Sequence, residues 1–568
     1  MRSPSDKLRT SGFPVGLCES LFAYALIFSF LFLTHLPLLR LPYFWDEAGY
    51  FIPAARDLLL TGSLVPHTTL SNAHPPLVML WLAFWWKFSA YTPAVTRTAM
   101  LFAAAFALLG VWRLARDVTN QAVAFATVLC TALYPVFFAQ SSLAHLDMMA
   151  AALTLWGLAM YVERRPVATV VFFALAPLAK ETAIIAPLGL FVWELVCPRL
   201  GRAGLQARVR QCEKQDASAA EVRDLGGKST NKDCAGKRGP QGLLCSCSLL
   251  LCIVPLAAWL IYHHHHTGFY FGNPEYLHYN LGATANPLRI MLALLLRLWQ
   301  VLGYLNLFLL TLAAALVMRE PPLRQPDGTP RPRIAINAQL VFAVVILAYA
   351  VALSVAGGAV LARYMLPVVP LVILICVSTL YRRVRRWTWW IAFTCAAFVA
   401  QLFIPPPYRI APEDTLLYRD YVILHKLAAN ELSRHPHARV LTAWPASDEL
   451  TRPFLGYVKQ PLEVVRIENF SAPEMVRASQ ATEMFDIALL FTTKWQPPHP
   501  LLRRPLFGQQ VQQANNHYHE DLPPQVAASL FGGRVVRYLN RNNEWVAIIA
   551  IEKIENAVWH GEGRSSLQ

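Results

Sequence analysis

Two adjacent carboxylates, Asp46 and Glu47, follow directly after the first long apolar stretch of the sequence. A carboxylate held at the edge of a membrane can take the proton of a reacting hydroxyl group that lies within hydrogen-bond distance. Asp46 is therefore a candidate general base. Without other features, both side chains would equally suit two solvated charges in a loop.

Later segments also place ionisable or aromatic side chains beside apolar stretches. A guanidinium group can hold a phosphate through two parallel hydrogen bonds and an ammonium group acts as a point charge, so the basic residues are candidate phosphate clamps. Basic side chains at helix ends can also simply extend to the interface. Glu47 and a later aspartate could orient an acceptor hydroxyl, help to hold a divalent cation, or be ordinary helix-end charges. The candidates in these segments are His74, Asp147, Lys180, Glu181, Arg363 and Tyr364.

The elements that must bring these residues together are membrane-spanning helices. The chain of 568 residues is 55% hydrophobic and 15% charged, and several of its windows have the roughly 17–25 apolar residues that a spanning helix needs. We predict a mainly α fold in which residues 1–404 form about eleven spans, followed by a small α/β domain. The predicted spans cover 21–39, 98–116, 121–140, 148–162, 243–262, 337–356 and 388–404, with four others ending near Lys180, Cys197, Arg319 and Arg382.

Segments rich in Lys and Arg set the sidedness. Such segments stay on the cytoplasmic side, which accounts for the net charge of +15 and places the N-terminus and a flexible loop, 198–242, inside. The first outer loop, 41–96, then lies on the opposite side, and its Trp-rich stretch 75–91 is predicted to lie on the membrane surface. All candidate residues share the outer face under this topology.

Residues 405–568 are predicted to form the α/β domain outside the membrane, because charged residues return and apolar runs shorten. The segment has no basic stripe interleaved with aromatic residues, which argues against nucleic-acid binding. The predicted helices are 413–434 and 473–484, and the predicted strands are 438–443, 487–492, 534–539 and 544–551, the last two as a hairpin.

Neither the cysteines nor a run of histidines predicts a metal site. The ten cysteines all precede residue 396, and Cys245 and Cys247 lack zinc-ligand spacing, so we interpret them as packing residues. The adjacent residues His263–His266 cannot all point one way. We predict that they begin an interfacial outer loop that continues to Asn286.

The order of the motifs resembles the GT-C superfamily, in particular glycosyltransferase family 39, with its protein O-mannosyltransferases and aminoarabinose transferases. In that family an aspartate-glutamate pair opens the first outer loop, a Pro-Pro-Leu turn ends it, an aspartate begins a later span, and an Arg-Tyr-x-x-Pro segment lies near the lipid phosphate. The likeness is strongest over 40–195 and returns at 362–370. The chain departs from the pattern at His74, where bacterial relatives often have lysine, and at Glu181, where they often have glycine.

The resemblance implies transfer of a sugar from a polyprenyl-phosphate donor to a hydroxyl of a protein, lipid or glycan acceptor, on the outer face and with inversion. Asp46, Glu47 and Asp147 would be catalytic. Membrane lipids are further partners, and a divalent metal ion is a candidate cofactor. We expect a multi-pass protein of a bacterial inner membrane. The residues expected to bind substrate are His74, Lys180, Glu181, Arg363 and Tyr364.

Two other classes of function remain open at this point. A transporter or flippase for a lipid-linked solute would also be polytopic, although transporters often have internal repeats and broken midplane helices, whereas here the polar groups gather at one face. A membrane-anchored assembly or sensor protein would instead act through residues 405–568.

Overall fold

The computed structural model covers residues 1–568 and describes residues 15–196, 248–272, 286–495 and 520–551. The predicted cytoplasmic loop 198–242 lies outside the described residues, as do residues 273–285 of the predicted outer loop.

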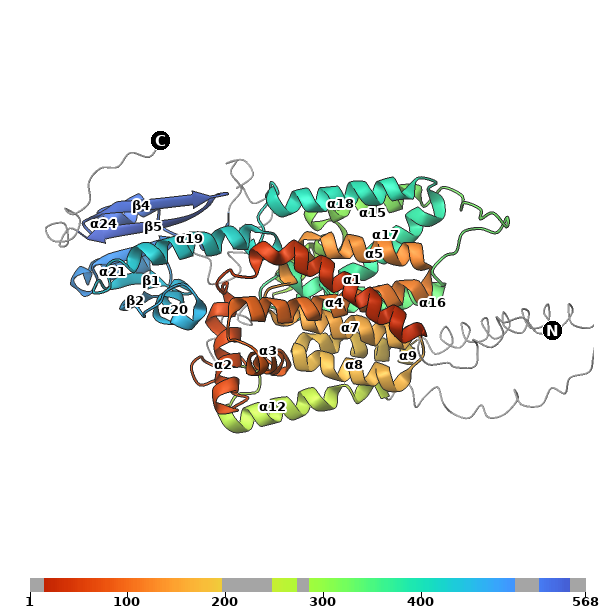
Figure 1. Ribbon diagram of the computed structural model, residues 1–568, viewed down its shortest axis with the longest axis horizontal. Helices are drawn as coiled ribbons and strands as arrows, with labels where there is room; N and C mark the ends of the chain where they lie inside the picture. Colours follow the sequence, from red (N-terminus) through yellow and green to blue (C-terminus); the bar gives the residue numbers. More distant parts are fainter. Residues whose placement is uncertain (1–14, 197–247, 273–285, 496–519, 552–568) are drawn as a thin grey trace, which may run out of the picture.

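Apolar helices from the first 404 residues run side by side as one bundle, with a small sheet domain at one end (Figure 1). Within the described ranges, five helices are long and apolar enough to cross a membrane and five others are shorter apolar helices of 10–17 residues. The mainly α class is confirmed, whereas the count of about eleven spans stays a prediction. The bundle comprises α1 (Val15–His35), α4 (Pro93–Val118), α5 (Gln121–Leu133), α7 (Leu146–Val162), α8 (Pro166–Ala179), α9 (Ile185–Val196), α12 (Ile253–Thr267), α14 (Pro287–Leu302), α15 (Leu307–Val317), α16 (Ile336–Ala356), α17 (Val369–Arg383) and α18 (Trp387–Phe403).

Helix α7 is buried over nearly its whole length and packs between α4 and α8. It is rich in alanine, and small residues let helices approach closely in a membrane. A Cβ atom at Gly157 would lie 2.6 Å from the ring of Phe173 in α8, and one at Gly110 in α4 would lie 3.0 Å from Trp156. These contacts pack α7, whose first turn carries Asp147, closely against both neighbouring helices.

Two predicted spans are interrupted. Pro135 has no N–H group to continue α5, so the predicted span 121–140 divides into α5 and a short α6 (Pro135–Gln140). Helices α14 and α15 are likewise separated at η5 (Tyr304–Asn306), where Leu305 and Asn306 have φ values of 49° and 67°. The change of backbone hand at these two residues ends α14 and restarts the chain as α15.

The position predicted for the histidine run is wrong. Residues His263–His266 form the last turn of α12 rather than the start of a loop. The helix ends at Thr267, because the next residue, Gly268, adopts φ 79°, the left-handed conformation that commonly terminates helices.

The Trp-rich stretch forms α3 (Leu77–Phe88), a helix of 12 residues. At 1.5 Å per residue it is about 18 Å long, well short of the ~30 Å hydrocarbon layer. This length favours the predicted location on the membrane surface. Helix α2 (Ile52–Thr61) precedes it and runs across the direction of the long helices in Figure 1.

The C-terminal domain contains a five-stranded sheet in the order β2-β1-β3-β5-β4. Strands β1, β2 and β3 pair in parallel, and β5 pairs antiparallel with both β3 and β4. The predicted strands and hairpin are present, together with β2, which was not predicted. The elements are α19 (Leu417–Leu432), β1 (Val440–Ala443), α20 (Ala446–Thr451), β2 (Val464–Ile467), α21 (Ala472–Ser479), β3 (Ile487–Phe491), α24 (Pro524–Leu530), β4 (Gly533–Arg541) and β5 (Glu544–Ile551).

Short helical turns at the sheet end of the bundle carry the candidate residues. Hydrogen bonds join this region to the sheet domain: the Tyr43 backbone N–H donates to the Leu455 carbonyl at 3.4 Å, and the side-chain hydroxyl of Tyr457 donates to the Tyr43 carbonyl at 2.9 Å. The turns are η3 (Glu47–Phe51), η4 (Glu181–Ile184), η6 (Ala362–Met365) and η7 (Pro412–Asp414).

Candidate functional site

Arg363 is the centre of the candidate site. Its Nη2 atom lies 2.5 Å from Asp46 Oδ2, its Nη1 atom lies 3.3 Å from Glu413 Oε1, and its Nε atom lies 3.5 Å from Asp147 Oδ2. The three carboxylates come from η3's N-cap, η7 and the first turn of α7. The guanidinium is buried and is therefore surrounded by negative charge from three separate segments.

Lys180 provides a second cation beside the first. Its Nζ atom lies 2.6 Å from Asp147 Oδ1 and 3.6 Å from the centre of the Tyr364 ring. Asp147 therefore bridges the two cations, and its place in the first turn of α7 is favoured by the helix dipole. Tyr364 packs against Lys180 on one side and is also within 5.8 Å of Arg363 Cζ.

The charged groups of this cluster differ in their access to solvent, and Glu413 is 10% exposed. The Asp46 side chain is 32% exposed, whereas those of Arg363, Asp147 and Lys180 are 6%, 5% and 9% exposed. A reacting molecule can thus reach the carboxylate of Asp46 directly, with the two cations behind it.

His74 and Glu181 form a separate pair next to this cluster. The Nδ1 atom of His74 lies 3.2 Å from Glu181 Oε2, and the ring of His74 lies against Tyr50 and Phe51. Burial raises the pKa of Glu181, whereas the nearby His74 and Lys180 together lower it by more. The resulting pKa is about 2, so the carboxyl group is ionised at neutral pH.

Glu47 lies away from the exposed carboxylate, although it is the next residue. It is fully buried and pairs with Arg97 at 3.3 Å, and it also accepts hydrogen bonds from the backbone N–H groups of Phe44 and Ala144. These bonds join the first outer loop to the segment that precedes α7. The structure therefore brings Asp46, Asp147, Lys180, Arg363 and Tyr364 together and places Glu47 in a supporting position.

His145 is fully buried and contacts the cluster through Arg363. Arg363 Nη1 donates a hydrogen bond to His145 Nδ1 at 2.9 Å. Burial, together with the positive charges of Arg363 and Lys180, holds the pKa of His145 well below its ordinary value, so the ring stays neutral and can accept this bond.

Residues 73–209 match the model of a family described as dolichyl-phosphate-mannose-protein mannosyltransferases. The matched segment begins beside His74 and includes Asp147, Lys180 and Glu181. No curated protein sequence matches the chain.

The solved structures similar to this one include two of ArnT and one of an archaeal oligosaccharyltransferase. ArnT from Cupriavidus metallidurans in the apo state has a TM-score of 0.50 at 13% identity, over 94% of this chain and 98% of ArnT. The same protein bound to undecaprenyl phosphate has a TM-score of 0.50 at 13% identity, over 94% and 97%. The resemblance to the GT-C glycosyltransferases is confirmed. An Archaeoglobus fulgidus oligosaccharyltransferase in complex with Zn and sulfate has a TM-score of 0.42 at 13% identity, over 82% and 67%.

Within the candidate site, Glu47 and Asp147, which the sequence suggested could hold a divalent cation, do not meet around a shared position. Glu47 bonds to Arg97, whereas Asp147 bonds to Lys180. In the part of the chain that the structure describes, no three His, Cys, Asp or Glu residues are grouped so that they could hold a metal ion. The acidic residues of the site gather around an arginine instead.

Two residues of the candidate site, Glu413 and Arg97, were not predicted from the sequence. Glu413 lies in the segment assigned to the C-terminal domain, far from any recognised motif, yet it contacts Arg363. Arg97 lies just before the predicted span 98–116 and could have been noticed, because a charge at the start of an apolar run needs a partner. Nothing in the sequence indicates which carboxylate that partner is.

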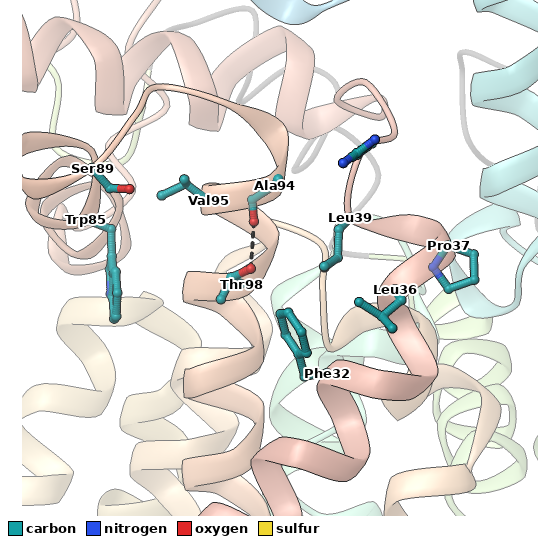
Figure 2. A pocket seen from close by; sticks show the side chains of 10 residues that line it. Phe32, Leu36, Pro37, Leu39, Trp85, Ser89, Ala94, Val95 and Thr98 are labelled. Carbon is teal, nitrogen blue, oxygen red and sulfur yellow. Dashed lines mark hydrogen bonds between the residues drawn. The ribbon is translucent and has the colours of Figure 1, made fainter.

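The GT-C-like bundle also has an apolar groove of about 620 Å³ on its side, between α1, α3 and α4. Figure 2 shows Phe32, Leu39, Trp85 and Val95 along its walls. None of the residues of the charged cluster lines it. The groove is therefore distinct from the candidate site.

Proposed function

We propose that this chain is a membrane glycosyltransferase that moves a sugar from a polyprenyl-phosphate donor to an acceptor hydroxyl on the outer face, with inversion at the anomeric carbon. The observation that carries the proposal is the accessible carboxylate of Asp46 in contact with the buried Arg363, beside a second cation, Lys180. Inverting transfer needs a base on one face of the sugar and positive charge at the leaving phosphate on the other.

Arg363 and Lys180 are the proposed phosphate ligands. Both are buried, so a phosphate that reaches them interacts in a medium of low dielectric constant and gains more than it would in water. Their present partners are carboxylates, which the incoming phosphate would replace as acceptors of the same N–H groups.

Asp46 is the proposed general base. The acceptor oxygen forms its bond to the anomeric carbon while the bond from that carbon to the phosphate oxygen breaks. The hydroxyl proton passes to Asp46, and polyprenyl phosphate leaves with the electron pair. Asp147 contacts both cations and therefore acts as their positioning residue.

Glu47, His74 and Glu181 are proposed to support this chemistry. Glu47 positions Asp46 through Arg97 and two backbone N–H groups. His74 stands where relatives often have a lysine, and its Nδ1 atom lies 3.2 Å from Glu181, the residue that follows the proposed phosphate ligand Lys180.

The donor and the location rest on similarity. The family that matches residues 73–209 is described by a dolichyl-phosphate-linked sugar, and the ArnT structure holds undecaprenyl phosphate. We propose the same kind of lipid-phosphate donor here, in a bacterial inner membrane with the sheet domain outside. The acceptor class is taken up below.

The test is transfer by the purified full-length protein from a panel of radiolabelled polyprenyl-phosphate sugars, with acceptor extracts present. We expect wild-type protein to consume one donor and Asp46→Asn to lose roughly 10²–10⁴-fold in rate, the usual contribution of a general base.

Asp327→Asn is the matched control. Asp327 is a solvent-exposed aspartate in the loop between α15 and α16, at the end of the bundle away from the sheet domain (Figure 1). It should transfer at the wild-type rate. Intact donors in every wild-type incubation would contradict the proposed activity.

A further inference from the structure

Two indole side chains meet beside Asp46, one from each part of the molecule. Trp45 immediately precedes Asp46, and Trp444 follows β1 in the sheet domain. Their ring centroids are 5.3 Å apart and the ring planes are inclined at 82°. We call this arrangement the indole corner.

The indole corner is rigidly held. A Cβ atom at Gly49 would lie 2.5 Å from Trp444 Cζ2, so the outer loop packs directly on that ring. Tyr421 of α19 contacts Trp45 edge-on, with centroids 5.6 Å apart. Trp45 itself has φ 41°, a left-handed conformation that is rare for bulky side chains and that tends to occur at ligand-binding sites.

The corner also has unused polar atoms. Trp444 is 41% exposed and Trp45 is half-buried. Among the described residues, neither indole N–H donates a hydrogen bond, and Asp46 Oδ1 accepts none because Arg363 is bonded to Oδ2. The Nε1 edge of Trp444 faces Gly49, where an ideal Cβ would lie 2.7 Å from Nε1, so the exposed part of the corner consists of indole ring surface and the carboxylate of Asp46.

We propose that the indole corner binds a carbohydrate acceptor. This inference rests on the proposed function and specifies the class of its acceptor. The C–H face of a pyranose ring packs on an indole, while its hydroxyl groups bond to carboxylates. A serine or threonine side chain offers one hydroxyl and no ring face, so it would leave the indole surface unused.

The corner places its ligand where transfer can occur. Trp45 and Asp46 are consecutive residues and both are partly exposed, so a sugar ring on the exposed indole surface lies beside the segment that carries the proposed base. Trp444 belongs to the sheet domain, whereas the phosphate ligands belong to the bundle. The sheet domain therefore selects the acceptor, and the bundle holds the donor.

Saturation-transfer difference NMR with full-length protein in nanodiscs tests the inference, using cellotriose and chitotriose as probes. These sugars have equatorial substituents and so present flat C–H faces. We expect wild-type protein to bind at least one of them, with the strongest saturation at the axial ring protons. Trp444→Ala should bind roughly tenfold more weakly, and Trp444→Phe should keep most of the affinity.

The matched control is Trp390→Ala, which removes a tryptophan of similar exposure, 44%, from α18. It should bind the probes as wild type does. Wild-type affinity in Trp444→Ala overturns the inference, and so does a wild-type protein that binds neither trisaccharide, including one that binds a threonine peptide instead. The binding measurement needs no donor, so a protein that binds the sugars at Trp444 but consumes no donor contradicts the proposed function alone.

Discussion

Arg363 is the residue on which the electrostatics of the site depend. Three carboxylates form ion pairs with its guanidinium group, and a neutral histidine accepts a hydrogen bond from it. A lysine at this position has one compact charge and cannot reach several partners in one plane. The identity of the cation therefore matters more than its charge.

We predict that Arg363→Lys lowers kcat/KM for the lipid-phosphate donor by roughly 10²-fold, as does the loss of a preorganised hydrogen-bond donor at a developing charge. Steady-state kinetics with the donor identified in the transfer assay would measure it. The control is Arg331→Lys, which also alters an arginine stacked on a tyrosine, but in the loop between α15 and α16. An unchanged kcat/KM in Arg363→Lys would contradict its role as a phosphate ligand.

The buried pair of Glu47 and Arg97 makes a prediction about stability. Glu47→Gln leaves Arg97 buried without a countercharge, so the free energy of unfolding should fall by roughly 3 kcal/mol. Glu19→Gln breaks the exposed pair with Arg116 and should cost about 0–1 kcal/mol. Denaturant titration of both variants in the same detergent gives the comparison, and equal losses would show that burial of the pair is unimportant.

Asp414 makes the stability depend on pH. Burial and the charge of Glu413 raise its pKa from the ordinary 3.8 to about 7, against the opposing effects of Tyr304 and Arg363. An acid whose pKa is raised by folding contributes stability that is fully present below its unfolded pKa and is lost as the pH rises through the folded value. Wild-type Tm should therefore fall between pH 4 and about pH 7 relative to the Tm of Asp414→Asn. Parallel Tm curves for the two proteins would rule this out.

At the scale of the elements, α12 holds the segment that carries His74. Trp259 Nε1 donates to the Ala73 carbonyl at 2.9 Å, and His263 Nε2 lies 2.7 Å from Ser71 Oγ. The histidine run thus serves as a helix end that fixes a loop, which explains why the structure continues α12 through it.

We predict that Trp259→Phe weakens donor binding. The change removes one buried hydrogen bond, worth about 1 kcal/mol, and frees the backbone beside His74. The donor KM should rise about fivefold while kcat changes less. Trp156→Phe, which removes an equivalent bond to Phe106 within the bundle, should leave the donor KM unchanged. Identical effects of the two variants would mean that α12 does not position His74.

Elements with a strong local signal were predicted well, and those set by packing were not. Long apolar runs predicted α1, α4 and α16, and alternation predicted the hairpin of β4 and β5. Strand β2 was missed because its four residues are short, only half-buried and interrupted by Arg466. The break at Pro135 was not predicted, although proline is a local signal for the end of a helix. The sequence has no comparable signal for the break at Leu305.

At the scale of the whole molecule, the sequence predicted which motifs share one face but not which atoms meet. The contacts of Arg363 with Asp46 and Asp147 follow from motifs on the predicted outer face. The contact with Glu413 depends on how the chain returns from α18 to the sheet domain, which no local pattern encodes. The opposite orientations of Asp46 and Glu47 depend on the partner Arg97 and could not be predicted from adjacency.

The junction of the outer loop with the sheet domain can be tested at Gly49. An added methyl group would overlap the ring of Trp444, so Gly49→Ala should cost about 1–3 kcal/mol of stability. In a Trp444→Ala background the overlap disappears, and the same change should cost less than about 1 kcal/mol. A double-mutant cycle on thermal unfolding measures this coupling, and additive effects would show that the two residues are not packed together.

The ion pair between Asp46 and Arg363 sets an order of events under the proposed chemistry. While the guanidinium is bonded to Asp46 Oδ2, that oxygen is not available to an acceptor hydroxyl group. An arriving phosphodiester competes for the same N–H groups and releases it. Asp46 Oδ2 can therefore act as the base only after the donor has bound. It pairs with Arg363 again when polyprenyl phosphate leaves, so an acceptor that binds first does not react.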